Sequence, residues 1–219
     1  RYVDLGLDQS KSQVVGNIKF DIAAPEQYVR QAEQLKQDWQ LADRQVIVLA
    51  STHAPEEESL LKQLQPHLNS NPKLLCIVVP RHPERFDEVY KVCQSLNLNT
   101  QRRSLKQPIQ IDTQVFLADS MGEMWLWYAL SQACFVGGSL NEPGGGHNIL
   151  EPMVLDVPTV IGPRYFNFQS IVDEFVAEHG LLIGTDAAQV VQQLLSCLDD
   201  PIQAQQLIEQ AELVLQRNK

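Results

Sequence analysis

Residues 141–152 read Asn141-Glu142-Pro143-Gly144-Gly145-Gly146-His147-Asn148-Ile149-Leu150-Glu151-Pro152. This stretch follows a short apolar strand at 134–136 and precedes a helix-like run at 149–155. Glycines lack a Cβ, so the backbone N–H groups of Gly145 and Gly146 can approach a ligand closely. A helix N-terminus adds partial positive charge and unpaired N–H groups. Strand, glycine loop and helix start therefore predict an anion site, most often one for phosphate.

Two polar side chains follow the glycines. Asn148 and Glu151 are three residues apart, so they share one face of the first helical turns. A carboxylate beside a phosphate site suits the vicinal hydroxyls of a ribose, and the combination suggests a nucleotide. The alternative is a mobile surface loop with a helix cap, because a short glycine motif is a weak signal by itself.

Length and composition favour a globular protein. The chain has 219 residues, 44% of them hydrophobic, and a formal net charge of −10. This charge argues against nucleic acid as a partner, because phosphate neutralisation needs clustered Lys and Arg. None of the four cysteines lies in a C-x-x-C pair or at zinc spacing, and Cys76 and Cys134 are expected to be buried thiols of a reducing compartment. We find no signal peptide and no apolar run of membrane-spanning length.

Short apolar strands alternate with amphipathic helices along most of the chain. Continuous apolar strands indicate burial on both faces, so the alternation predicts a doubly wound α/β domain with a Rossmann-like parallel sheet. The expected strands are residues 45–50, 74–79, 100–103, 114–118, 134–136, 158–161 and 181–183. Helices are expected at 25–39, 56–68, 84–96, 123–132, 149–155 and 168–179, with two more split near residue 200. Residues 1–20 are expected to be a linker from an absent N-terminal domain, and 21–219 to form the nucleotide-binding domain.

Ligands of open parallel sheets bind outside the carboxyl ends of the strands. Polar clusters occupy the loops at that edge after four of the predicted strands: residues 51–58, 80–86, 119–124 and 137–148. This coincidence is stronger than any one motif. It predicts that these four loops line a common site.

Individual residues in these loops each have two interpretations. Arg81 can clamp a phosphate bidentately or pair with Glu84. His82 can donate to an oxyanion or cap a turn. Ser51 and Thr52 can reach a phosphate at the rim, although capping of the next helix is the more ordinary role.

The loop after the fourth strand offers contacts to a base. The backbone amides of Met121 and Gly122 and the apolar Met side chain suit the edge and face of a nucleobase. The alternative is a tight turn with Met121 in the core. Glu123 adds a carboxylate at a helix start.

Several common site motifs are missing. The sequence contains no G-x-G-x-x-G after the first strand, no G-x-x-x-x-G-K-[ST] and no G-x-S-x-G, which disfavours dehydrogenases, P-loop NTPases and α/β-hydrolases. Asp119 has no second acid at a spacing suited to a metal-bridged diphosphate. We therefore expect no metal and no cofactor.

Taken together, these loops resemble the Kdo transferases of Gram-negative bacteria, where Kdo is 3-deoxy-D-manno-octulosonic acid. The resemblance runs in order over about residues 16–200. It is carried by the segments 16–21, 51–57, 79–86, 119–124, 135–139 and 145–152. One departure is Ala54-Pro55, where the family pattern has a glycine before the acidic pair, and it weakens a role for His53.

The resemblance implies the C-terminal half of a GT-B glycosyltransferase, a fold of two facing Rossmann-like domains. It implies CMP-Kdo as the donor substrate, a lipid A precursor as the acceptor, and inverting transfer without a metal in lipopolysaccharide biosynthesis. The acceptor domain, the catalytic base and a membrane anchor would then lie before Arg1, at the cytoplasmic face of the inner membrane, and no catalytic residue would lie in this chain.

Carried onto this chain, the resemblance gives each loop a role. Arg81 and the amides of the glycine loop would hold the CMP phosphate, Met121 and Gly122 would contact cytosine, and Glu151 would accept hydrogen bonds from the ribose. The complete set of expected nucleotide-binding residues is Arg81, His82, Met121, Gly122, Glu123, Gly145, Gly146, His147, Asn148 and Glu151. The alternatives are another GT-B enzyme, such as a UDP-sugar transferase or epimerase, and a non-catalytic nucleotide-binding domain.

Overall fold

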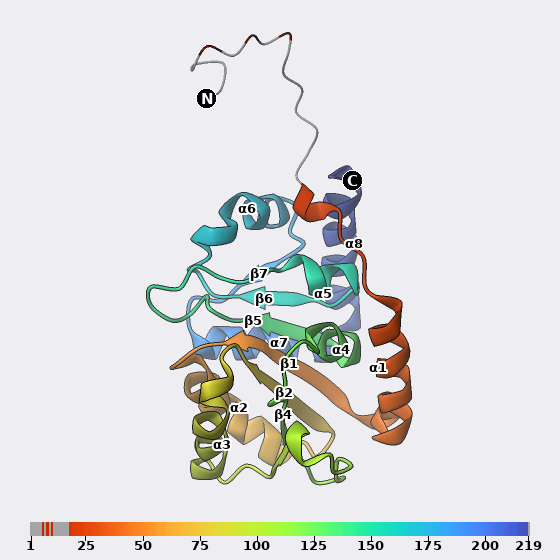
Figure 1. The fold of residues 1–219 in the computed structure, drawn as a ribbon, viewed down its shortest axis with the longest axis vertical. Coiled ribbons are helices and arrows are strands. Elements are labelled where there is room, and N and C mark those ends of the chain that lie inside the picture. Colours follow the sequence, from red (N-terminus) through yellow and green to blue (C-terminus); the bar gives the residue numbers. More distant parts are fainter. Residues whose placement is uncertain (1–5, 7, 9, 11–17, 219) are drawn as a thin grey trace.

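The computed structural model describes residues 6, 8, 10 and 18–218, and among these residues the strands form one parallel sheet (Figure 1). Its order is β3-β4-β2-β1-β5-β6-β7, and neighbouring strands pair in parallel. The strands are β1 (Gln45–Thr52), β2 (Leu74–Pro80), β3 (Thr100–Arg102), β4 (Val115–Leu117), β5 (Ala133–Val136), β6 (Thr159–Ile161) and β7 (Leu182–Ile183). The predicted doubly wound Rossmann-like sheet is confirmed.

Helices cover both faces of this sheet (Figure 1). They are α1 (Glu26–Asp38), α2 (Glu56–Ser70), α3 (Phe86–Ser95), α4 (Met124–Leu130), α5 (Leu150–Val154), α6 (Gln169–Ala177), α7 (Ala187–Asp199) and α8 (Pro201–Arg217). The core clusters place α1, α4, α5 and α6 on one face and α2, α3 and α7 on the other. Helix α8 contributes to both clusters.

The central strand shows why the sheet is buried on both sides. In β1, Val46 and Val48 belong to the cluster under α1 and α4, whereas Ile47 and Leu49 belong to the cluster under α2 and α7. Successive side chains of a strand point to opposite faces. An uninterrupted apolar run is therefore what a strand covered by helices on both faces requires.

Most expected elements lie within a few residues of their observed bounds. One of the two-residue shifts is at the end of α4, which stops at Leu130 although the sequence predicted helix to 132. Gln132 instead exchanges hydrogen bonds with Val46: its backbone N–H donates to the Val46 carbonyl at 2.9 Å, and its side-chain oxygen accepts from the Val46 N–H at 2.5 Å. This pairing with β1 ends the helix and starts β5.

The expected linker, residues 1–20, lies mostly outside the described residues. Its last residue, Phe20, is fully buried, and its ring stacks on Phe175 of α6 with 6.1 Å between centroids. The packed part of the domain thus includes Phe20. All four cysteines are free and buried, as expected for Cys76 and Cys134.

The sheet has its topological switch point between β1 and β5. Strands β2, β4 and β3 lie on one side of β1, and strands β5, β6 and β7 lie on its other side. The chain crosses from the first side to the second between β4 and β5. Loops after β1 and β5 leave the sheet side by side at this point, which is where open α/β sheets form a ligand crevice.

Candidate functional site

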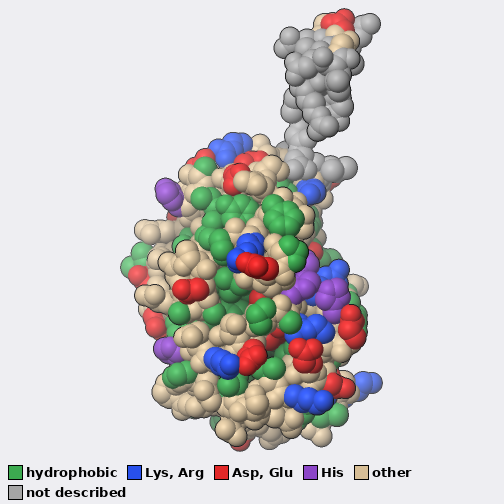
Figure 2. Space-filling view, turned by 90° about the vertical axis from the view of Figure 1, so that its left-hand side faces the viewer, with side chains coloured by type: hydrophobic (Ala, Val, Ile, Leu, Met, Phe, Trp, Pro, Cys, Tyr) green, Lys and Arg blue, Asp and Glu red, His purple; other side chains and the backbone are tan. Residues whose placement is uncertain are grey.

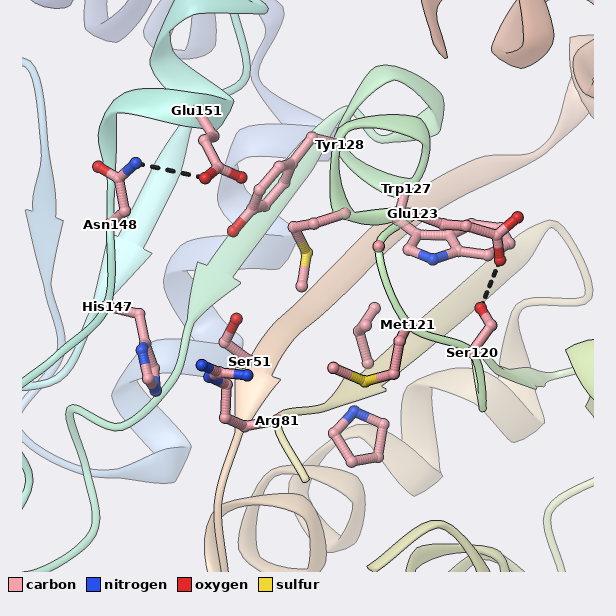
Figure 3. Close-up of a pocket in the computed structure, with 14 residues that line it drawn as sticks. Ser51, Arg81, Ser120, Met121, Glu123, Trp127, Tyr128, His147, Asn148 and Glu151 are labelled. Carbon is pink, nitrogen blue, oxygen red and sulfur yellow. Dashed lines mark hydrogen bonds between the residues drawn. The ribbon is translucent and has the colours of Figure 1, made fainter. Parts of the chain in front are cut away.

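A cavity of about 270 Å³ lies at the carboxyl ends of the central strands (Figure 3). Its wall combines the loops after β1, β2, β4 and β5, the four loops that the sequence singled out. The lining residues are Ser51, Val79, Pro80, Arg81, Ser120, Met121, Gly122, Glu123, Met124, Trp127, Tyr128, His147, Asn148 and Glu151. The structure therefore brings eight of the predicted site residues into one wall, including Ser51 from the rim.

Four predicted residues lie outside this wall. Thr52 was expected at the rim but is fully buried, at the end of β1 where the register with β2 shifts between residues 50 and 52. His82 is half-buried and lies beside His53. Gly145 and Gly146 form the loop behind His147 and do not line the cavity.

The two glycine amides are already bonded within the protein. The N–H of Gly145 donates to the Arg164 carbonyl at 3.1 Å, and that of Gly146 donates to the Gly138 carbonyl at 2.8 Å. The helix that follows has only five residues. The expected contact of these amides with a phosphate stays a prediction, and it requires both bonds to open. What the glycine run does here is place His147 and Asn148 on the cavity wall.

Arg81 has a backbone anchored to β1 and a side chain that extends towards the cavity. Its N–H donates to the Thr52 carbonyl at 3.0 Å, while its guanidinium makes no hydrogen bond or ion pair with any described residue. The alternative pairing with Glu84 is therefore not observed; Glu84 lies 3.9 Å from a ring nitrogen of His82. Arg81 is exposed and borders the cavity, which leaves its fork of N–H donors available to an anion.

Arg85, four residues later, has the opposite environment. It makes a two-bonded ion pair with Glu57, at 2.6 and 3.2 Å, and a third bond to Glu88 at 3.0 Å. The Glu57 side chain is only 1% exposed. Arg85 thus neutralises a buried carboxylate at the start of α2 and fixes the β2–α3 loop next to it.

The loop after β4 presents its apolar side chain to the cavity. Met121 is 55% exposed, and Gly122 adopts a positive φ of 81° that favours glycine. The Tyr28 hydroxyl donates to the Gly122 carbonyl at 2.9 Å and holds this turn against α1. An exposed Met at the edge of a cavity suits contact with a flat ring, and the alternative of Met121 in the core is excluded.

Glu123 lines the cavity but is held by neighbours. Arg103 donates two hydrogen bonds to its carboxylate, at 3.2 and 2.8 Å, and the Ser120 hydroxyl donates a further one (Figure 3). Burial opposes ionisation of this carboxyl, but the bonds from Arg103 and Ser120 outweigh burial and lower its pKa. Glu123 therefore stabilises the loop in ionised form.

Asn148 and Glu151 lie together on the wall, as their spacing predicted (Figure 3). The Asn148 amide donates to the Glu151 carboxylate at 3.3 Å, and the Asn148 side-chain oxygen accepts from the Leu150 N–H at 3.1 Å. Burial raises the pKa of Glu151, although the hydrogen bond from Asn148 acts in the opposite direction. A carboxylate with one weak partner in a half-buried position gains from hydroxyl donors such as those of a ribose.

Sequence inspection missed Glu56 as the residue that joins two loops of the site. Glu56 is only 1% exposed. Its carboxylate accepts hydrogen bonds from four backbone N–H groups: those of His53 at 2.9 Å, Gly138 at 2.8 Å, Ser139 at 3.0 Å and Leu140 at 2.8 Å. Glu56 thus connects the loops after β1 and β5 across the switch point. An acid at a helix start is too common to have shown this.

Three histidines gather at the edge of the cavity. His53 and His147 form a hydrogen bond between their Nε2 atoms at 2.8 Å, with rings stacked at 5.0 Å, and His82 meets His53 edge-on at 5.1 Å. Figure 2 looks onto the carboxyl ends of the strands and shows histidine side chains beside basic ones on this face. Burial lowers the pKa of His147 to about 4, with His53, Arg81 and His82 adding to the effect.

Residues 6, 8, 10 and 18–218 contain no group of three or more His, Cys, Asp or Glu placed to hold a metal ion. Asp119 is committed to Arg102 at 2.7 Å and to the Ser104 hydroxyl at 2.6 Å. No helix in the same part of the chain is both long and apolar enough to cross a membrane.

Comparisons with known proteins agree with this geometry. The family model of the group 1 glycosyl transferases matches residues 31–214. The chain is 38% identical over 198 residues to the 3-deoxy-D-manno-octulosonic acid transferase of Haemophilus influenzae, covering 90% of this chain and 46% of that protein. It is 35% identical over 205 residues to the Bordetella pertussis transferase of the same name, with the same two coverages. The chain thus spans about half the length of these relatives.

Solved structures give the same assignment. The C-terminal CMP-Kdo binding domain of WaaA from Acinetobacter baumannii is 66% identical, with a TM-score of 0.87 over 88% of this chain and 100% of that one. The α,α-trehalose 6-phosphate synthase of Burkholderia multivorans, at 13% identity and a TM-score of 0.63, shares the fold alone. The chain belongs to the group 1 glycosyl transferases and, within them, corresponds to the C-terminal domain of the 3-deoxy-D-manno-octulosonic acid transferases.

Proposed function

We propose that this domain binds CMP-Kdo and that the whole protein transfers Kdo to a lipid A precursor in lipopolysaccharide biosynthesis. One observation carries the proposal: a single cavity at the switch point combines an arginine whose side chain has no partner among the described residues, an exposed Met-Gly turn and a half-buried Asn–Glu pair. These are the contacts that phosphate, base and ribose require. The 66% identity to a CMP-Kdo binding domain supports CMP as the nucleotide.

Each part of the cavity then has a role in donor binding. Arg81 holds the phosphate and stabilises it as negative charge develops on the leaving CMP, which is the work that a metal ion does in other transferases. Met121 and Gly122 contact the cytosine, and Glu151 accepts hydrogen bonds from the ribose. Asn148 keeps the Glu151 carboxylate in place. The reaction would need no metal and no cofactor.

The rest of the reaction belongs to parts of the protein beyond this domain. A cavity of about 270 Å³ lies below the usual range of roughly 300–1,000 Å³ for small-molecule sites, so it suits part of a nucleotide sugar. The acceptor, the base of an inverting transfer and the contact with the inner membrane would come from an N-terminal domain. Without that domain, the loss of alignment forfeits about 7–11 kcal/mol of barrier lowering, and this chain alone would not transfer sugar.

Nucleotide preference tests the proposal directly. Thermal unfolding is measured with CMP, UMP and AMP, and CMP at ~100 times its dissociation constant should stabilise by about 2.7 kcal/mol. CMP should give the largest shift. Equal shifts with UMP would favour a UDP-sugar enzyme on the same fold, and no shift with any nucleotide would refute the binding role.

A further inference from the structure

The histidine pair at the switch point has no role in the function proposed so far. His53 comes from the loop after β1 and His147 from the loop after β5, 94 residues later. The backbone is shaped to admit the pair: a Cβ at Gly138 would lie 2.9 Å from the His147 ring and 3.5 Å from the His53 ring. The stacked rings are therefore a built feature of the loops that Glu56 connects.

A hydrogen bond between two imidazole nitrogens fixes the roles of the two Nε2 atoms. One Nε2 must donate its proton and the other must accept through its lone pair, so in the neutral pair the accepting ring carries its own proton on Nδ1. The donating ring then has an unprotonated Nδ1. One further proton can bind at that Nδ1 without breaking the N–H···N bond, and the pair then carries a single positive charge.

The surroundings keep the pair neutral while no anion is present. Burial lowers the pKa of both rings, and His82 and the cation Arg81 lower that of His147 further. On the His53 side, Glu56 and Glu57 favour the charged ring, whereas Arg85 and His82 oppose it. These groups face the pair from α2 and from the β2–α3 loop.

An anion beside Arg81 would reverse this balance. It would cancel the repulsion from the guanidinium and add an attraction for a proton on the pair. Figure 3 shows His147 next to Arg81 on one side of the cavity. We propose that His53 and His147 form an anion subsite that takes up one proton when an anionic group of the donor arrives beside Arg81. The proposal rests on the proposed donor binding. The anion is a phosphate or a carboxylate, the two acidic groups of a CMP-activated sugar acid.

Calorimetric titration in two buffers of different ionisation enthalpy measures the proton uptake. The chain is titrated at pH 6.5 with cytidine, with CMP, and with CMP in the presence of free Kdo. His147→Gln removes the subsite, and His67→Gln on the exposed face of α2 is the matched control. Wild type should take up about one proton more than His147→Gln on binding the ligand. The ratio of the wild-type affinity to that of His147→Gln should grow as pH falls from 8.5 to 6.5. Titration of the CMP phosphate itself cancels in this comparison.

The three ligands distinguish the source of the anion. Excess uptake with CMP but not with cytidine assigns the phosphate, and excess uptake only after Kdo is added assigns the carboxylate. If wild type and His147→Gln take up the same number of protons on binding CMP, both with and without Kdo, the subsite is refuted while the proposed function stands. If CMP does not bind wild type at all, the proposed function fails and the subsite with it. His53→Gln provides the same test should His147→Gln fold poorly, and the His67→Gln protein should match wild type.

Discussion

The two sides of the cavity are built differently. The β1/β5 wall, residues 51–56 and 137–149, is joined internally by the four backbone bonds to Glu56 and by the His53–His147 bond. The β2/β4 wall, residues 80–86 and 119–123, presents Arg81 and Met121 with no fixed side-chain partner among the described residues. One wall is thus preorganised by backbone bonding, while the other offers side chains free to meet a ligand. Substitutions in the first should change stability, and substitutions in the second should change binding.

Glu56→Gln should have the largest effect. The amide keeps the shape of the carboxylate but removes its charge and turns an N–H₂ donor towards backbone N–H groups. Charge-assisted bonds are worth about 1.5–3 kcal/mol each and are not additive, so we expect a loss of roughly 4 kcal/mol or more in the free energy of unfolding. Chemical denaturation measures it. Glu58→Gln, at an exposed pair with Lys62, should cost less than about 0.5 kcal/mol. Equal effects of the two substitutions would show that the four bonds do not hold this wall.

Arg85→Ala tests a fixed part of the β2/β4 wall, the buried ion pair with Glu57. It leaves the Glu57 carboxylate buried without its cation, and breaking such a pair costs about 3 kcal/mol or more. Denaturation should detect this loss, and Lys62→Ala at the exposed pair supplies the control. A stable Arg85→Ala protein would contradict the view that Glu57 depends on this arginine.

Arg81→Ala should show the reverse pattern. The guanidinium has no partner to lose in the part of the chain that the structure describes, so stability should stay within about 0.5 kcal/mol. Affinity for CMP should fall by about 1.5–3 kcal/mol through the lost charged hydrogen bonds. Calorimetric titration gives the affinity, and Arg81→Lys should recover only part of it because lysine lacks the planar fork. Unchanged affinity of Arg81→Ala for CMP would show that Arg81 does not bind the phosphate.

The sequence predicted the sheet because local signals carry that information. Every strand but β3 (Thr100–Arg102) is an apolar run, and the carboxyl-end rule then places Arg81, Met121 and Glu151 around one cavity. Even the end of α4 was misplaced only by a contact between distant residues, the Gln132–Val46 pairing.

The missed features all depend on contacts far apart in sequence. Glu56 meets the glycine loop 82–84 residues away, yet locally it is an ordinary first-turn acid. The bonds of the Gly145 and Gly146 amides to protein carbonyls are equally invisible, since a glycine run shows only that close approach is possible. Packing decides whether the amides of such a run bond to a ligand or to carbonyls of the same protein, and no short motif encodes that packing.

The smallest expected effect concerns how pH acts on the β1/β5 wall. Because the folded-state pKa of His147 is about 4, below the ordinary value of about 6.5, the folded protein binds fewer protons than the unfolded chain between these values. Stability from this group is fully present above pH 6.5 and is lost as pH falls towards 4. His147→Gln cannot titrate, so its stability should fall less over this interval. His147 is only half-buried, and solvent screening reduces the expected difference to about 1 kcal/mol. Denaturation of both proteins at pH 7.5 and 4.5, with His67→Gln as the exposed control, measures it. Parallel pH dependence of wild type and His147→Gln would show that the histidine pair is protonated as easily in the folded domain as in the unfolded chain.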